Sequence, residues 1–143
     1  MSNRLRQCLR LTHVRGIQHA VAAMASQQAQ QRVQYLELSE DQLARLRGGF
    51  RAEPGISSGA ALASVGEIAM RLDLAREGLT KSLNGARDEA AIAKDARLAA
   101  RRQQESAKRL GEKAAAEASR KAEKKQANAV TGRTPRLKGD TGA

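Results

Sequence analysis

The sequence has very few of the residues that build a thick hydrophobic core. It contains no Trp, one Tyr (Tyr35) and one Phe (Phe50), and many of its apolar residues are alanine. Alanine buries little apolar surface, so this composition does not favour a large globular core. We expect helices that pack against each other, against a partner, or both.

Proline is equally scarce, since it occurs only at Pro54 and Pro135. No stretch shows the alternating pattern of a strand, and the strong helix formers Ala, Leu, Arg, Lys, Glu and Gln dominate. These residues have the highest intrinsic helix propensities. The sequence therefore predicts an all-α chain.

A single cysteine, Cys8, excludes an internal disulfide and favours a reducing compartment. The longest apolar run, residues 20–25, is too short to span a bilayer, and no signal peptide is visible. The Arg-bearing, acid-free residues 1–36 share features with an organelle transit peptide, although their Gln-rich continuation fits an ordinary helix better.

The organising pattern is a heptad seam in the second half of the chain. Steps of four and three residues connect Val65, Ala69, Leu72, Arg76, Leu79, Leu83, Ala86, Ala90, Ala93, Arg97, Ala100, Gln104, Ala107, Gly111, Ala114 and Ala118. This spacing is typical of a coiled-coil helix. It predicts a second helix over about 60–128.

A first helix is predicted over about 3–47, ending before Gly48 and Gly49. Its apolar residues are Leu5, Leu9, Ile17, Val21, Met24, Tyr35, Leu38, Leu43 and Leu46, with a seam that continues through Gln28 and Gln31. Residues 48–59 contain Gly, Ser and Pro54 and predict the turn. Residues 129–143 are expected to form a disordered tail.

Together these segments predict an antiparallel two-helix coiled-coil hairpin with a longer second helix, in a single domain over residues 1–128. If the chain folds back at Gly55, facing residues have numbers that add to about 110. Ile17, Val21 and Met24 are then expected to pack on the alanines of the second helix. The second helix is expected to continue without a partner beyond about Glu105.

Chemistry that would support catalysis is missing. Cys8, His13 and His19 are the only candidate nucleophile and imidazoles, and their helical spacing keeps them from acting together or binding one metal. No glycine-rich phosphate-binding loop is present either. We predict no enzymatic activity, no catalytic or metal-binding residues, no cofactor and no small-molecule partner.

The net charge of +11 is concentrated at the two ends of the chain. Residues 1–36 carry +5, residues 37–96 carry −2, residues 97–138 carry +9, and Asp140 completes the total. In a hairpin both basic segments meet at one end, which favours an acidic partner there. Non-specific binding to nucleic-acid phosphates is the alternative, although Tyr35 and Phe50 are too few and too distant to form a stacking platform.

The layout resembles the flagellar export protein FliJ and the related central-stalk proteins of type III secretion. The most similar segments are QLARL at 42–46, GISSG at 55–59 and RQQESAKRL at 102–110. The resemblance covers residues 1 to about 128 and concerns architecture more than any specific motif. It implies a non-enzymatic cytoplasmic stalk, peripheral to the inner membrane through the export apparatus.

The family resemblance also implies three partners: the hexameric export ATPase, the cytoplasmic domain of the export-gate membrane protein, and export chaperones. For the ATPase ring, the expected contacts are Arg4, Arg6, Arg10, Arg97, Arg101, Arg102, Lys108 and Arg109. For the gate, the expected contacts are Gln42, Leu46, Phe50, Ile68, Leu72 and Ala75, with Leu79 next in the same spacing. The family has aromatic residues at several gate positions, whereas this sequence has only Phe50 nearby.

Three alternatives stay open at the level of sequence. The basic chain could bind nucleic acid, or act as a structural coiled-coil adaptor whose charge is incidental. The two helices could also open at the Gly/Pro hinge and pair between molecules. The resemblance does not separate flagellar from virulence-related export.

Overall fold

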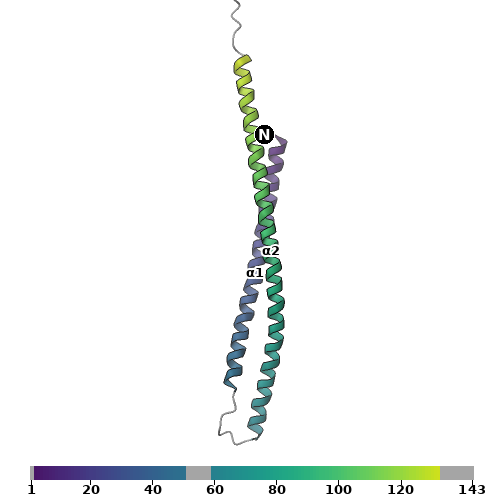
Figure 1. The fold of residues 1–143 in the computed structure, drawn as a ribbon, viewed down its shortest axis with the longest axis vertical. Helices are drawn as coiled ribbons and strands as arrows, with labels where there is room; N and C mark the ends of the chain where they lie inside the picture. The colour runs from purple at the N-terminus through teal and green to yellow at the C-terminus, as the bar shows by residue number, and fades with distance from the viewer. Residues whose placement is uncertain (1, 51–58, 133–143) are drawn as a thin grey trace, which may run out of the picture. The chain divides into compact units, whose positions relative to one another are not determined.

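The computed structural model describes residues 2–50 and 59–132 of the chain. It contains two helices, α1 (Asn3–Gly49) and α2 (Gly59–Gly132), and no strand within these residues (Figure 1). They form an antiparallel helical hairpin with the longer helix second, which confirms the predicted fold class. Gly48, Gly49, Gly59 and residues 129–132, predicted as turn or tail, are helical, and Phe50 is described but not helical. The other residues of the predicted turn (51–58) and of the predicted tail (133–143) lie outside the described residues.

Local sequence signals explain the two ends of α1. Ser2 caps its start, because the Leu5 amide donates to the Ser2 hydroxyl at 3.3 Å and the Arg6 amide donates to the Ser2 carbonyl at 3.2 Å. At the other end Gly48 and Gly49 form the last positions of the helix, and the Phe50 amide donates to the Arg47 carbonyl at 3.3 Å. No proline lies within either helix.

The residues group into two units, each containing part of both helices. We call them the terminal unit (Met1–Gln18 and Arg101–Ala143) and the central unit (His19–Ala100). They are described separately below.

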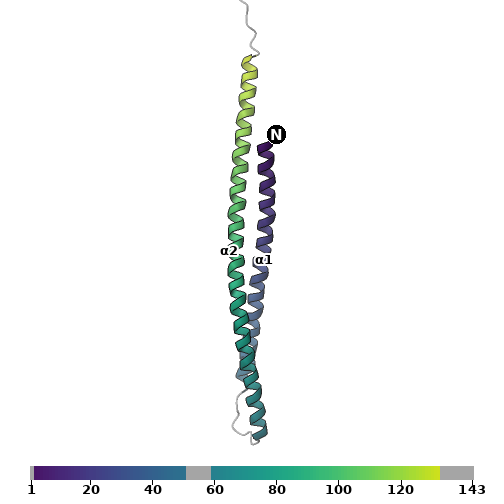
Figure 2. The same ribbon diagram turned by 90° about the vertical axis from the view of Figure 1, so that its right-hand side faces the viewer.

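In the terminal unit the start of α1 lies beside α2 (Figures 1 and 2). The Thr12 hydroxyl lies 3.4 Å from the Ala107 carbonyl oxygen, and Arg4 forms an ion pair of 3.2 Å with Glu117. Ala107 and Ala114 are buried at this contact. Beyond Ala118 every described residue of α2 is exposed, because α1 does not reach that far.

In the central unit the two helices enclose a small apolar cluster. Val33, Leu83 and Ala86 are buried, and Leu36 and Ala90 pack against them. Three ion pairs flank the contact between the helices: Arg32 with Glu89 at 3.6 Å, Arg87 with Glu37 at 3.4 Å, and Arg47 with Asp73 at 3.0 Å. The first two pairs are largely exposed, and in the third Arg47 is half-buried. Exposed ion pairs add little to stability, so these pairs mainly help to set the register of the two helices.

The heptad seam predicted for α2 is confirmed. Every predicted seam residue from Val65 to Ala118 is buried or half-buried, except Arg97, which is exposed. Arg97 is long enough to extend its guanidinium from a seam position into water.

The face predicted to point inward on α1 is wrong. Leu9, Ile17, Val21, Met24, Tyr35, Leu38 and Leu46 are all more than half exposed. The other two apolar residues predicted for this face, Leu5 and Leu43, are half-buried as predicted. The further residues of α1 that face α2 are Cys8, Thr12, Arg15, His19, Ala22, Ser26, Ala29, Val33, Leu36, Glu40 and Arg47, all buried or half-buried. Small and polar residues on this face allow α1 to approach the alanine seam of α2 closely.

The predicted register is also wrong. Contacting residues have numbers that add to 118–121 in the hydrogen bonds and ion pairs of the terminal unit, and to 120–124 in the ion pairs of the central unit, not to about 110. The prediction placed the fold-back at Gly55. In the structure Arg47 near the end of α1 pairs with Asp73, so the first turns of α2 lie beyond the end of α1 and shift the register. For the same reason the predicted loss of partners beyond Glu105 occurs later, after Ala118.

Candidate functional site

Charge differs sharply between the two units. The described residues of the terminal unit contain thirteen Lys and Arg and four Glu, a net charge of +9. Those of the central unit contain nine Lys and Arg and nine Asp and Glu, which cancel. The terminal unit is therefore the strongest candidate for binding an acidic partner.

Most of the cations predicted to contact an ATPase ring belong to this unit. Seven of the eight lie in it: Arg4, Arg6, Arg10, Arg101, Arg102, Lys108 and Arg109. The eighth, Arg97, belongs to the central unit. All eight side chains are exposed, so each can reach a partner without any rearrangement of the unit in which it lies.

Few of these cations are neutralised within the chain. Arg4 pairs with Glu117, and Arg101 pairs with Glu105 at 3.3 Å, both at the surface. The other five in the terminal unit form no ion pair within the described residues: Arg6, Arg10, Arg102, Lys108 and Arg109. Exposed pairs contribute roughly 1 kcal/mol at most, so an external carboxylate can replace them.

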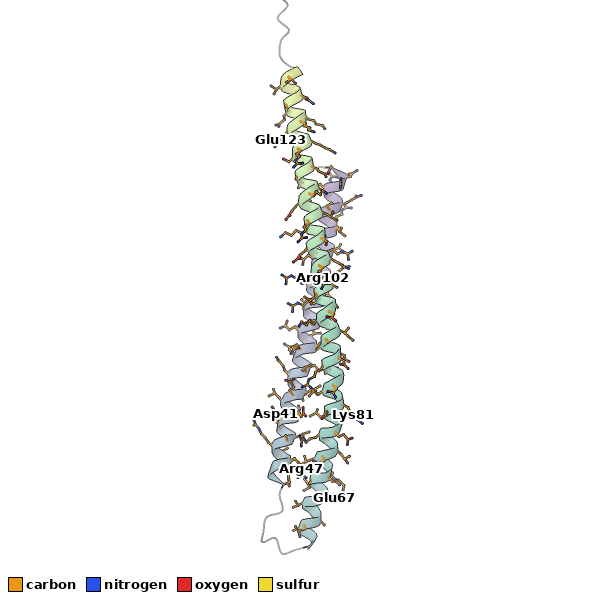
Figure 3. All side chains as sticks on the ribbon, in the orientation of Figure 1. Asp41, Arg47, Glu67, Lys81, Arg102 and Glu123 are labelled. Atoms are coloured by element: carbon orange, nitrogen blue, oxygen red, sulfur yellow. The ribbon has the colours of Figure 1, made fainter. Side chains whose placement is uncertain are left out.

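The α2 cations form a stripe. Arg101 and Arg102 precede Lys108 and Arg109 by seven residues, which is about two helical turns, so the two pairs share one face (Figure 3, where Arg102 is labelled). Their spacing follows the heptad of the seam, which keeps the stripe at a constant angle to α1. We call these four residues the cationic stripe.

A shallow groove lies between the helices of the terminal unit. It has a volume of about 280 Å³ and is lined by Leu11, Arg15, Arg102, Gln103, Ser106, Ala107 and Leu110. The Arg15 guanidinium donates to the side-chain oxygens of Gln103 at 2.8 Å and Gln18 at 3.0 Å. Leu11 and Leu110 are partly exposed at its sides, so the groove offers apolar contact beside cations. Sequence reasoning missed these two leucines because it assigned them to no seam.

The predicted gate contacts all lie in the central unit, but on different faces. Phe50 and Leu72 are half-buried, whereas Gln42, Leu46, Ile68 and Ala75 are exposed. The register of the Arg32–Glu89 pair places Leu46 opposite Ala75. Gln42 lies on the opposite side of α1 from the seam.

Two more exposed apolar residues lie in the first turns of α2. Leu62 is 45% exposed and Met70 is 64% exposed, and they lie about 80° apart around α2, whereas Ile68 lies on the other side of the helix. They were not predicted, because the register expected from the sequence places this segment of α2 against α1. They extend the candidate gate surface.

The candidate residues for catalysis or metal binding are not brought together. Cys8 is a free, half-buried thiol, and the described residues contain no group of three His, Cys, Asp or Glu side chains placed to hold a metal. A second groove, of about 940 Å³ in the central unit, is open to solvent and lined mainly by Gln and Ala with Arg87, Lys94 and Arg97. Neither helix in the described part of the chain is long and apolar enough to cross a membrane.

Comparison with known proteins found no matching family model, no matching curated protein and no matching solved structure. Arguments about function therefore depend on the geometry and charge of the two units.

Proposed function

We propose that this chain is a non-enzymatic, cytoplasmic component of a flagellar or type III protein export apparatus. In this proposal the terminal unit docks on acidic loops in the centre of the hexameric export ATPase. The hairpin end of the central unit contacts the cytoplasmic domain of the export-gate membrane protein, and export chaperones are further partners. The observation that carries the proposal is the separation of charge, +9 in one unit and zero in the other.

The separation of charge supports docking through one defined part of the molecule. A cationic surface raises the rate of encounter with an acidic site and orients the approach, and both effects weaken as salt increases. The neutral central unit adds no such attraction. Its exposed Leu62, Ile68 and Met70 suit an apolar contact with the gate instead.

The two-helix construction supports a role in coupling. A pair of helices has no sixfold symmetry, so it can contact only some subunits of a hexameric ring at one time. Contact with some subunits and not others would bias the order in which they hydrolyse ATP. This is a positional effect and requires no catalytic residue from the chain.

The test compares two triple variants with the same change in charge. Arg102→Glu, Lys108→Glu and Arg109→Glu replace unpaired exposed cations of the terminal unit, and Arg45→Glu, Lys81→Glu and Lys94→Glu replace unpaired exposed cations of the central unit. We expect the first variant to bind the purified export ATPase at least roughly tenfold more weakly and to lose ATPase stimulation. The second should retain both. Equal behaviour of the two variants would contradict docking through the terminal unit.

Nucleic-acid binding is the second candidate, favoured by the unpaired cations Arg120, Lys121, Lys124 and Lys125 on the part of α2 that α1 does not cover. Such binding would be independent of sequence and would weaken steeply with salt. A pull-down from nuclease-treated lysate separates the candidates. Retention of an export-type ATPase supports the proposal, whereas recovery of ribosomal or nucleoid proteins that nuclease removes supports nucleic-acid binding.

A further inference from the structure

A second heptad pattern runs along the exposed side of α1 in the central unit. It consists of Val21, Met24, Gln28, Gln31, Tyr35, Leu38 and Gln42, connected by steps of three and four residues. Each lies two residues after a residue that faces α2, and two residues correspond to about 200° around a helix. These seven residues therefore share the side of α1 opposite to α2. We call them the outer face.

The apolar residues of the outer face are among the most exposed in the chain. Val21 is 64% exposed, Met24 63%, Tyr35 69% and Leu38 63%. Single exposed apolar residues are common, but a regular heptad of them is the pattern by which one helix binds another. The outer face is uncharged at all seven positions.

The order of residues on this face is self-complementary in the antiparallel direction. If two copies pair about a twofold axis between Gln28 and Gln31, Gln28 of each copy faces Gln31 of the other. The next layers pair Met24 with Tyr35, and then Val21 with Leu38. In these three layers apolar residues meet apolar residues and amides meet amides, so each Gln28 and Gln31 amide has a hydrogen-bonding partner at its level. Gln42, at the end of the outer face, lies at the level of Ile17 of the second copy. Paired amides at seam positions also fix register.

Charge along α1 favours this direction over the parallel one. Residues 1–36 carry five Arg and no acid, whereas Glu37, Glu40 and Asp41 follow within five residues. A parallel pair would place the acid-free segments against each other. It would also place the acidic residues 37–41 of the two copies against each other, whereas the antiparallel pair places them beside residues 18–22, which contain no Asp, Glu, Lys or Arg.

We propose that two copies of this chain associate through the outer faces of their α1 helices, in antiparallel orientation and with Gln28 facing Gln31 of the second copy. The four large apolar side chains offer less area than the roughly 800 Å² per partner of a standard stable interface. The dimer is therefore a weak one, with a dissociation constant in the micromolar range. This inference goes beyond the proposed function and does not depend on it.

Sedimentation velocity of the full-length chain, from low to high micromolar concentration, tests the proposal. The wild type should shift from monomer to dimer, and Met24→Glu or Tyr35→Lys alone should weaken association at least roughly tenfold, because each places an unpaired charge in an apolar layer. The double variant with both substitutions should recover association, since the opposite charges face each other only in the antiparallel pair. Ile92→Lys, at a 70% exposed position on α2, is the matched control and should associate as the wild type does.

The register is tested by cross-linking on a Cys8→Ser background. A mixture of Met24→Cys and Tyr35→Cys chains should form a disulfide-linked heterodimer, whereas either chain alone should not, because identical positions are about 16 Å apart along the antiparallel pair. Circular dichroism should show unchanged helicity in every variant. Three outcomes would overturn the proposal. The wild type could stay monomeric at all concentrations, or the double variant could fail to recover association. A dimer that is insensitive to Met24→Glu and Tyr35→Lys would also overturn it, because that result is expected if the two chains exchange helices. Assembly only with a different protein's helix would overturn it too.

Discussion

At the scale of single residues, Arg76 is the least satisfied position in the described structure. It occupies a seam position of α2, where its Nε atom is buried and has no hydrogen-bonding partner among the described residues. A buried donor without a partner retains the full cost of leaving water. Arg76, which lies between Leu72 and Leu79 along the seam, therefore lowers the stability of the hairpin.

Replacing this residue should stabilise the hairpin. We expect Arg76→Leu to raise the free energy of unfolding by about 1–3 kcal/mol, because it removes the orphaned donor and adds apolar contact. Urea unfolding followed by circular dichroism measures the change. Arg71→Leu, at an exposed position with an ion pair to Glu67, is the control and should change stability by roughly 0.5 kcal/mol or less. A less stable Arg76→Leu variant would contradict this, because it would show that the guanidinium makes a stabilising interaction in the folded protein.

Leu83 is the side chain on which the central unit depends most. It is 2% exposed and is the largest fully buried residue in the described structure. Leu83→Ala should lower the free energy of unfolding by about 2–5 kcal/mol through lost burial and a cavity. Leu74→Ala, at a 64% exposed position on the same helix, should cost far less. Similar losses in the two variants, measured by thermal unfolding, would contradict the assigned core.

At the scale of elements, α2 presents a seam of small residues on which α1 lies closely. Ala107 is 3% exposed, and its carbonyl oxygen lies 3.4 Å from the Thr12 hydroxyl of α1. Because Ala107 is almost fully buried, a longer side chain at this position would push against α1. Small size at such positions is therefore a structural requirement and not only a means of promoting helix formation.

Enlarging a seam alanine should separate the helices. Ala107→Leu is expected to destabilise the terminal unit by about 1–3 kcal/mol through overpacking, whereas Ala115→Leu, at an exposed position eight residues on, should be nearly neutral. Hydrogen exchange of amides in residues 3–18 reports the change locally. Unchanged protection in Ala107→Leu would refute close packing at this level.

The same element explains which parts of the fold could be predicted. The seam of α2 was predictable because its apolar and small residues recur with a single heptad phase from Val65 to Ala118. α1 has two heptad faces, and the more apolar one, with Val21, Met24 and Leu38, points to solvent. Periodicity identifies a face that can bind a helix, but it does not say which helix. The predicted register was wrong for the same reason, because ion pairs such as Arg47–Asp73 cannot be assigned until the face of α1 that contacts α2 is known.

The candidate site was predictable to a different extent. Exposed Arg and Lys residues remain exposed in almost any helical packing, so the cations of the terminal unit could be named from sequence. The apolar gate contacts depend on which turns α1 covers. Leu72, predicted as a gate contact, is half-buried, and Leu62 and Met70 are exposed although they were not predicted as contacts. Both differences arise because the predicted register covered the wrong turns of α2.

At the scale of the whole molecule, each of the two units carries its own kind of surface. The charge of the terminal unit suits binding that salt weakens, and the outer face of α1 in the central unit suits binding that salt leaves almost unchanged. We expect raised salt to weaken ATPase binding strongly while leaving self-association intact. Titration of both equilibria across a salt series measures this, and a parallel loss of the two would contradict the assignment of separate surfaces.

The connectivity of the hairpin has a consequence for its folding. Arg47 and Asp73 in the central unit are 26 residues apart in the chain, whereas Arg4 and Glu117 in the terminal unit are 113 apart. Short loops close at a lower entropic cost, so we expect the central unit to form first and the terminal unit to pair last. The buried residues of the terminal unit are alanines, Ala107 and Ala114, whereas the central unit also buries Val33 and Leu83. Separating the two helices therefore exposes less buried apolar side chain in the terminal unit than in the central unit. The most highly charged part of the molecule is thus the part whose helices separate first, and its cations can spread around an acidic partner while the central unit stays folded.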